Sequence, residues 1–549
     1  MLQAIEGNTY TGSFWGGSLQ SRWRTGPLPA SPAPCYTESM QDEAVFEAYK
    51  PLRNHLRKLC LADSLAVIRA YVQYLQLDTP IPRDCEVHRN FAFAASKSNK
   101  VALISEWELE TLCREVILNA QDGTYCPETL KKWSCLARAI NKLKELEDSI
   151  GEKFVSPDNI LLELHRTAHR QFPWQSAPPN KFVITRYFKI YSHPPLERII
   201  CEEVGMGIND LFIVGLALLG TYLDKFALFY PPRIDIPGLT LEAAEKFLAH
   251  FAIDLSQLKQ RLHAEQEMND KFAYAYNSLR AYPLIRMTYN KKDSLICPLP
   301  TLLFWRFTNG VYYEICTNKA FADAFGEAFQ IYVGDVLRQA IDASRTKFYP
   351  EEEYWVGKNK KRTADWIVEQ DDAILFIEVK TKRLVVLAKI EIDSEDALKN
   401  ELRKMADFVI QVYKAIKDYR ADQYPTFRFK HGRRIFPLIV TLEDWFLIGP
   451  KLLSGLSAMV EQGFNEAELP LEWLKEMPYS ICSIQEFEEA IQVMQVVGIK
   501  EFMEKKLFDD GKREWAFGVF LRSEFPEAAK SVRFLFPDDF KGLGVPSTK

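Results

Sequence analysis

Several features that would assign a function from composition alone are missing from this chain. Its net charge of −5 provides no basic excess of the kind that marks a dedicated nucleic-acid-binding module. Its 10 cysteines include no C-x-x-C pair and no Cys/His set with zinc-finger spacing, so neither a structural zinc site nor a disulfide framework is predicted. The sequence also lacks a glycine-rich phosphate-binding motif ending in Lys-Ser or Lys-Thr, which argues against ATP hydrolysis by this chain.

Export and membrane signals are missing as well. The N-terminus has neither the basic start nor the apolar core of a signal peptide, and the long apolar run from Leu211 to Leu223 is too short to span a bilayer. We expect that run to form a buried helix. A cytoplasmic protein with no membrane partner, in a reducing compartment, is the expectation that follows.

The composition is that of an ordinary globular protein. Of the 549 residues, 47% are hydrophobic and 26% are charged. This length exceeds the size at which one hydrophobic core stops growing, so two to four domains or subdomains are expected.

Changes in composition and periodicity divide the chain. The first residues are rich in Gly, Pro and Ser, whereas a long following region has apolar residues at three- and four-residue spacing, which is typical of amphipathic helices. Ser483 and Glu486 have the spacing of a helix capping box. The expected parts are a flexible tail (1–36), a helical recognition or regulatory region (37–280), a connector with a strand or two (281–317), a domain of different pattern (318–450) and a helical C-terminal subdomain (451–549).

The region from about residue 318 to 445 mixes helical and strand-like patterns. Apolar residues recur every fourth position in its first segment, and short β-rich runs follow. The pattern predicts an α+β fold in which the elements follow the order α, β, β, β, α, β. Their expected ranges are 318–341 (helix), 347–356, 364–369 and 373–381 (strands), 395–419 (helix) and 434–442 (strand).

Two of these strands bring charged residues together. Because side chains alternate across a strand, Glu378 and Lys380 lie on one face of the 373–381 run. The polar tetrad from Glu369 to Asp372 is a plausible turn, so the two runs can pair antiparallel and bring Asp365 beside Glu378. Two carboxylates and one ammonium group would then share a small volume.

Such a cluster predicts a divalent cation. Neighbouring carboxylates raise each other's cost of ionisation, and a cation compensates for it. Carboxylate oxygens without cysteine or histidine nearby suit Mg²⁺ or Mn²⁺. We therefore expect a Mg²⁺ or Mn²⁺ cofactor bound near Asp365 and Glu378, with Lys380 beside it.

These residues resemble the PD-(D/E)XK, or restriction-endonuclease-like, phosphodiesterase superfamily, over about a quarter of the chain. The resemblance implies that residues 318–450 form a nuclease domain whose restriction-endonuclease-like core, at about 318–445, is flanked by large helical regions. The family's Asp on the second core strand is similar to Asp365, and its Glu-x-Lys on the third is similar to Glu378-Val379-Lys380. Ala364 stands where the family's nominal Pro precedes the Asp. The resemblance implies that Asp365 and Glu378 are catalytic metal ligands and that Lys380 is catalytic.

Two helical positions extend the resemblance. The family's first core helix often supplies another metal-binding Glu, and Glu327 is similar in placement, with Asp323 and Asp335 as alternatives. Some members carry a Gln on the helix after the third strand, and Gln411 is a candidate for it.

The resemblance implies a metal-dependent nuclease that acts on DNA more readily than on RNA. Enzymes of this kind with large helical regions occur in bacterial anti-phage defence, where a protein trigger or self-association releases the nuclease. On that analogy, toxicity to the host would require the trigger and would vanish in Lys380→Ala. The alternative is a catalytically inactive nuclease-fold scaffold that binds partners through its helical regions.

Clustered basic residues are the candidates for contacting nucleic acid, although the region from 318 to 450 is neutral, with 22 Lys plus Arg and 22 Asp plus Glu. Solvated loops are the alternative interpretation of such clusters. One cluster, Lys358, Lys360, Lys361 and Arg362, precedes the proposed active strand, and a second, Lys382 and Arg383, follows it. A third cluster comprises Arg428, Lys430, Arg433 and Arg434.

Overall fold

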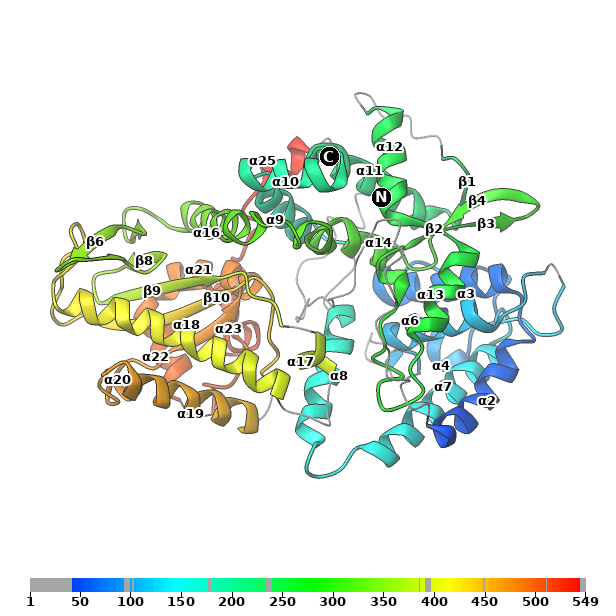
Figure 1. Ribbon diagram of the computed structural model, residues 1–549, viewed down its shortest axis with the longest axis horizontal. Helices are drawn as coiled ribbons and strands as arrows, with labels where there is room; N and C mark the ends of the chain where they lie inside the picture. Colours follow the sequence, from blue (N-terminus) through cyan, green and yellow to red (C-terminus); the bar gives the residue numbers. More distant parts are fainter. Residues whose placement is uncertain are drawn as a thin grey trace. The chain divides into compact units, whose positions relative to one another are not determined.

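The protein folds into two compact units in a computed structural model (Figure 1). Unit 1 comprises the described residues up to Asn318 with a short C-terminal piece, and unit 2 runs from Lys319 to Asp539. The expected tail, residues 1–36, lies outside the described part of the chain. The structure describes residues 42–92, 99–100, 103–123, 125–175, 179–232, 239–384, 386–390, 396–447, 450–509 and 511–543.

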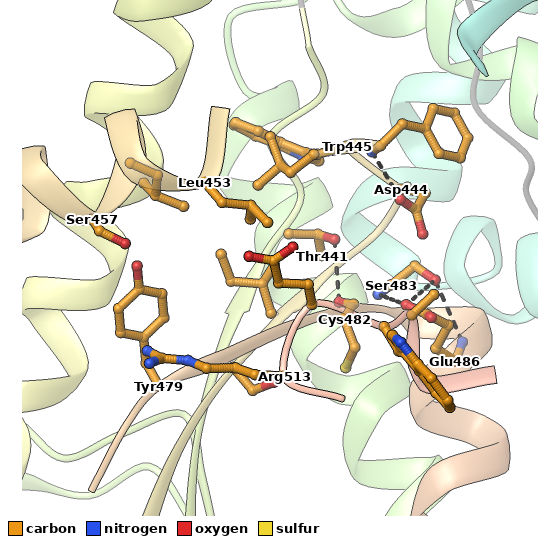
Figure 2. Close-up of a pocket in the computed structure, with 18 of the residues that line it drawn as sticks. Thr441, Asp444, Trp445, Leu453, Ser457, Tyr479, Cys482, Ser483, Glu486 and Arg513 are labelled. Atoms are coloured by element: carbon orange, nitrogen blue, oxygen red, sulfur yellow. Dashed lines mark hydrogen bonds between the residues drawn. The ribbon is translucent and has the colours of Figure 1, made fainter. Parts of the chain in front are cut away.

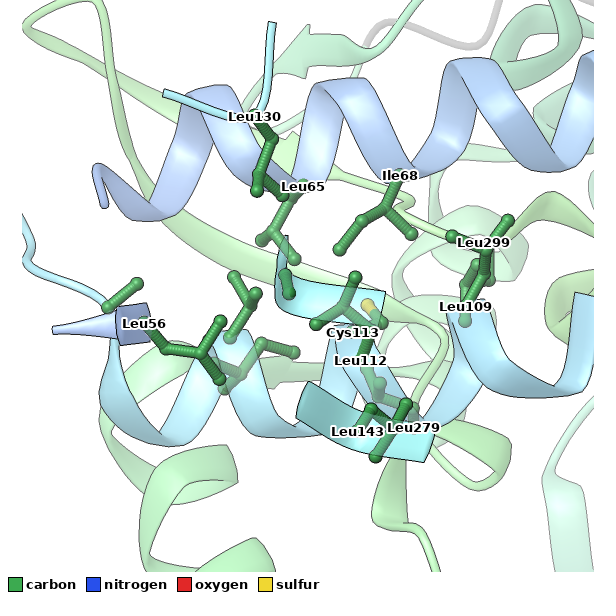
Figure 3. Packing of buried hydrophobic residues seen from close by; sticks show 14 of the residues in the cluster. Leu56, Leu65, Ile68, Leu109, Leu112, Cys113, Leu130, Leu143, Leu279 and Leu299 are labelled. Atoms are coloured by element: carbon green, nitrogen blue, oxygen red, sulfur yellow. The ribbon is translucent and has the colours of Figure 1, made fainter. Parts of the chain in front are cut away.

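Unit 1 is mostly helical, as its apolar periodicity predicts. Leu65 and Ile68 of one helix pack against Leu112 of another in a core that excludes water from their side chains (Figure 3). Its longer helices are α2 (Glu43–Leu56), α3 (Leu61–Leu77), α6 (Glu106–Asn119), α7 (Trp133–Phe154), α8 (Ile160–Gln175), α9 (Lys181–Tyr191), α10 (Pro194–Val204), α11 (Ile208–Asp224), α12 (Leu241–Phe251), α13 (Leu255–Glu265) and α14 (Pro300–Phe307), and its shorter ones are α4 (Arg89–Ala92), η1 (Ser278–Arg280), η2 (Asn309–Val311) and α15 (Tyr312–Ile315).

A four-stranded sheet in the order β1-β4-β3-β2 completes unit 1. It is formed by β1 (Ala227–Phe229), β2 (Ala252–Asp254), β3 (Leu284–Tyr289) and β4 (Lys292–Ile296). Two of these strands lie in the expected connector. The sheet therefore joins the connector to the helical region within one unit.

The apolar run from Leu211 to Leu223 is the buried helix α11, as predicted. No single helix in the described ranges is long and apolar enough to cross a membrane. The pair α10 and α11 passes that test together by length and composition, with a bend of 65° between the two helices.

A disulfide joins Cys60 to Cys126 in unit 1, so the expectation of a chain without disulfides is wrong at this pair. The two cysteines are 66 residues apart, and a spacing rule that looks for close pairs does not detect them. Around the bond, backbone bridges join Leu59 to Glu128 and Cys60 to Gln121. Gln121 and Glu128 are thereby held against the junction of α2 and α3.

Unit 2 contains the predicted helices and strands, but it has a further strand before the 364–369 strand and a short helix before the 395–419 helix. The expected first strand, 347–356, divides into two strands, and the second of them forms a hairpin with a further strand, β7. The elements up to the last predicted strand are α16 (Phe321–Ala340), β5 (Lys347–Pro350), β6 (Glu353–Val356), β7 (Asn359–Arg362), β8 (Trp366–Glu369), β9 (Ala373–Lys380), α17 (Val386–Ile390), α18 (Asp396–Arg420) and β10 (Arg434–Thr441).

The remaining residues are mainly helical but add one strand to the sheet, which sequence periodicity did not predict. The Ser483 capping box with Glu486 is confirmed. The elements are α19 (Pro450–Glu466), α20 (Trp473–Glu476), β11 (Ser480–Ser483), α21 (Ile484–Val497), α22 (Ile499–Leu507), α23 (Phe517–Glu524), α24 (Pro526–Ala529) and α25 (Pro537–Gly542), the last extending past the end of unit 2.

The five-stranded sheet of unit 2 has the order β11-β10-β9-β8-β5. The pairs β5/β8 and β8/β9 are antiparallel, whereas β9/β10 and β10/β11 are parallel. Helices cover both faces (Figure 1). Phe376 of β9 lies against Tyr419 of α18, whereas Trp366 of β8 donates a hydrogen bond to the Gln330 carbonyl of α16. Because side chains alternate, the even-numbered residues of β9 face α18.

Candidate active site

Asp365 and Glu378 meet across two neighbouring strands. In the antiparallel register of β8 and β9, Trp366 pairs with Ile377, so Asp365, one residue earlier, stands opposite Glu378. The backbone N–H of Val379 donates a 2.7 Å hydrogen bond to Asp365 Oδ2. Glu378 is almost fully buried, with 2% of its surface exposed. The strand pairing therefore places the two residues opposite one another, and the Asp365 charge acts on the Glu378 carboxyl group.

Lys380 completes the cluster from the end of β9. Its Nζ donates to Glu378 Oε1 at 2.6 Å and to Gln411 Oε1 of α18 at 3.2 Å. The ammonium group also lies 5.2 Å from the centre of the Phe408 ring. The side chain is 19% exposed, so the ammonium borders solvent while the carboxylate it binds does not.

In the absence of a cation, the electrostatics of the cluster favour the protonated form of Glu378. Burial and the neighbouring Asp365 carboxylate raise the pKa of Glu378 to about 8, and Lys380 opposes this only in part. Burial also raises the pKa of Asp365. The protein alone therefore does not balance the negative charge that Asp365 and Glu378 would carry if both were ionised at neutral pH.

A third carboxyl group, Glu351, lies close enough to influence the pair, and sequence reasoning missed it. Burial and then the Asp365 charge raise the pKa of Glu351, and Glu351 in turn raises that of Glu378. It directly follows β5, the strand beside β8. The acidic run after Pro350 is visible in the sequence, but only the sheet order reveals which strand end it joins.

Glu327 lies on α16 with an exposed side chain. Among the described residues, a set of three metal-ligating side chains with ligand atoms within 4.8 Å of one another is found in unit 1. Neither Glu327 nor Glu351 forms such a compact set with Asp365 and Glu378. The role of Glu327 in metal binding stays a prediction. Gln411, by contrast, contacts the cluster directly through Lys380.

The predicted nucleic-acid contacts differ in their surroundings. Arg362 is 63% exposed and acts electrostatically on both Asp365 and Glu351. Lys358 is exposed in the β6–β7 turn. Lys360 pairs with Glu353 and Lys361 with Asp418, at 2.7 and 2.6 Å.

The two basic residues after β9 are held by buried acids. Lys382 lies 3.2 Å from Glu401 of α18. Arg383 is buried and pairs with Glu443 at 3.0 Å, which does not suit the phosphate contact predicted for it. A buried, paired guanidinium of this kind holds the segment after β9 against the end of β10.

The third basic cluster lies away from the candidate site. Lys430 and Arg433 both bind Glu369, at the opposite end of β8 from Asp365. Arg434 pairs with Glu504 at 3.2 Å. This cluster therefore neutralises the far end of the strand pair.

No family model matches this chain, and no curated protein or solved structure matches it significantly.

A cavity of about 930 Å³ lies beside the ends of β10 and β11 (Figure 2). The carboxyl group of Asp444 points toward Ser483 and Glu486 there, and burial, with the Glu486 charge, raises its pKa. Thr441 on the cavity wall pairs in register with Lys380 of β9. The cavity thus borders the strand next to the candidate site but has its own pair of partly buried acids.

The raised pKa of Glu378 predicts an unusual pH dependence of stability. The unfolded chain loses this proton near its ordinary pKa of 4.5, whereas the folded protein keeps it to about pH 8. Between these values the folded state binds more protons, so its stability falls as pH rises. We expect Glu378→Gln to reduce this fall, measured as the urea midpoint of metal-free protein at a series of pH values.

The exposed Glu501→Gln provides the matched control, because its side chain lies on the surface of α22. That variant should follow the wild-type pH profile. An identical profile for Glu378→Gln and wild type would contradict the electrostatic account of the cluster.

Proposed function

We propose that this protein is a metal-dependent phosphodiesterase of the PD-(D/E)XK type that cleaves nucleic acid, with DNA as the more favoured substrate. The observation that carries the proposal is the approach of Asp365 and Glu378 across two antiparallel strands, with the Lys380 ammonium hydrogen-bonded to Glu378. The order of elements from α16 to β10 supports a restriction-endonuclease-like core.

The donor set fits Mg²⁺ or Mn²⁺. Asp365 and Glu378 offer hard carboxylate oxygens whose charge the protein does not balance, which is the setting that such a cation stabilises. Two protein carboxylates are enough, because Mg²⁺ commonly takes its remaining ligands from water and substrate phosphate. When bound, the cation would polarise the phosphoryl group and lower the pKa of a bound water.

The chain's own residues have separate tasks in this proposal. Two N–H groups of the Lys380 ammonium donate to Glu378 and Gln411. The third can donate to a phosphoryl oxygen on which charge develops. The Val379 N–H fixes the orientation of Asp365. Arg362, exposed and close to the carboxylates, can bind a neighbouring phosphate of the substrate.

Cleavage assays with Asp365→Asn test the proposal. Wild-type protein is expected to cut plasmid DNA, or failing that structured RNA, with Mg²⁺ or Mn²⁺, and to stop when a chelator removes the metal. Asp365→Asn should lose about 100-fold or more of this rate, because a ligand carboxylate becomes neutral. Asp371→Asn, in the exposed turn at the other end of the same two strands, is the matched control and should retain activity.

Equal cleavage by wild type and Asp365→Asn would reject the assignment of the site. If neither DNA nor RNA is cut in the presence of either metal and of lysate from infected cells as a source of trigger, the inactive scaffold becomes the favoured function. A role in anti-phage defence belongs to this same proposal and requires that activity depend on such a trigger.

A further inference from the structure

A second group of metal-ligating side chains lies in unit 1, far along the sequence from the acidic cluster. His55, Glu128 and Cys135 each offer one ligand atom, and these atoms all lie within 4.8 Å of one another. His55 is in the last turn of α2, Cys135 is in the first turn of α7, and Glu128 is in the segment between α6 and α7. Three separate elements therefore converge on one point.

Two distances match the edges of a tetrahedral metal site. Glu128 Oε2 lies 3.6 Å from Cys135 Sγ and 3.2 Å from His55 Nδ1. Zinc bonds to N, O and S at ordinary lengths and tetrahedral angles give ligand–ligand separations of about 3.3 to 3.6 Å.

The hydrogen bonding of His55 leaves one ring nitrogen facing the acid. His55 Nε2 lies 3.1 Å from the Cys135 carbonyl oxygen, which can only accept, so Nε2 carries the proton. In the neutral ring, the lone pair of Nδ1 then faces a carboxylate oxygen at 3.2 Å, which is repulsive unless a proton or a metal ion lies near both. A carbonyl that orients a histidine in this way is common behind bound metals.

We propose that His55, Glu128 and Cys135 form a binding site for a transition-metal dication of the zinc class. Histidine nitrogen, thiolate and one carboxylate suit Zn²⁺ better than Mg²⁺. The thiolate and carboxylate together balance the two charges of the ion, and the Cys135 thiol proton is released to solvent on binding. Glu128 is only partly buried, so water can take the fourth position.

The neighbourhood favours a preformed site. The Cys60–Cys126 disulfide, the Leu59–Glu128 bridge and the 3.2 Å hydrogen bond from Glu128 N to Lys58 O fix the backbone that carries Glu128. Lys58 and Arg138 approach the Glu128 carboxylate at 3.4 Å, but their side chains are 54% and 52% exposed and can turn to solvent when a cation binds. This site does not depend on the proposed nuclease activity.

Cobalt spectroscopy tests the site directly. Full-length protein with its disulfide intact is stripped of metal and titrated with Co²⁺, and one thiolate-to-cobalt charge-transfer band per chain is expected in the near ultraviolet, displaced by Zn²⁺ but not by Mg²⁺. Cys135→Ser should lose the band, whereas Cys201→Ser, at an exposed free cysteine, should keep it. Asp365→Asn should also keep it, which separates the two metal sites.

Two further variants cover the case in which Cys135→Ser does not fold. Glu128→Gln and His55→Asn should each weaken Co²⁺ binding at least about 10-fold, with unchanged circular dichroism of the metal-free protein. The proposal is overturned if wild type gives no thiolate band, if Cys135→Ser keeps it, or if both Glu128→Gln and His55→Asn bind Co²⁺ as tightly as wild type.

Discussion

Replacing Lys380 with methionine is expected to reduce metal-dependent cleavage by about 100- to 1000-fold while leaving the protein folded. The methionine side chain keeps the apolar stem that lies against Phe408 but has no donor for Glu378, Gln411 or a phosphoryl oxygen. Loss of a positioned donor removes stabilisation that matters most when charge develops in the transition state. The measurement is the rate of plasmid nicking at saturating Mg²⁺.

The design of that experiment separates chemistry from folding. Lys475→Met, on the exposed surface of α20, removes the same charge away from the site and should not change the rate. Under conditions in which the wild-type protein is toxic to a bacterial host, Lys380→Met should be tolerated. Equal toxicity of the two proteins would show that harm to the host does not require this ammonium group.

Gly334→Ala is expected to destabilise the protein by about 1 to 3 kcal/mol. A methyl group at this position of α16 would overlap Cζ2 of Trp366, so the helix or the indole must move. Trp366 is the first residue of β8 and directly follows Asp365 in the chain. We therefore expect a second effect, a loss of about 100-fold in cleavage rate, because a displacement of about 1 Å is enough to misplace a catalytic group.

Gly326→Ala on the same helix is the matched control, since a methyl group there meets nothing within 4 Å. Alanine is the better helix former, so this variant should be as stable as wild type or more stable by up to roughly 1 kcal/mol. Thermal midpoints and nicking rates of the two variants can be compared directly. A Gly334→Ala protein with wild-type stability would mean that Trp366 is less constrained than its packing indicates.

The central pair of the candidate site could be predicted because it depends on local rules. Side chains alternate along a strand, and the polar tetrad between β8 and β9 forms the turn, so the register of Asp365 and Glu378 follows from sequence alone. The main helices and strands of unit 2 were predictable for the same reason. Long apolar periodicity and a capping box are also local signals.

What could not be predicted depends on contacts between distant segments. Glu351 belongs to the cluster only because β5 pairs with β8, and Arg383 is buried only because Glu443 follows β10. β11 has four residues, too few for an alternating pattern to stand out. His55, Glu128 and Cys135 meet because three elements of unit 1 converge, which no spacing motif in the chain reveals.

The late strand β11 has a practical consequence for making shorter versions of this protein. It covers the edge of β10 through parallel pairing of Leu438–Thr441 with Ser480–Ser483. A fragment that stopped after β10 would leave the backbone donors and acceptors of a strongly apolar strand open to a second molecule, which is a common route to insoluble aggregates. Expression of unit 2 alone should therefore extend beyond α21, so that each copy completes its own sheet.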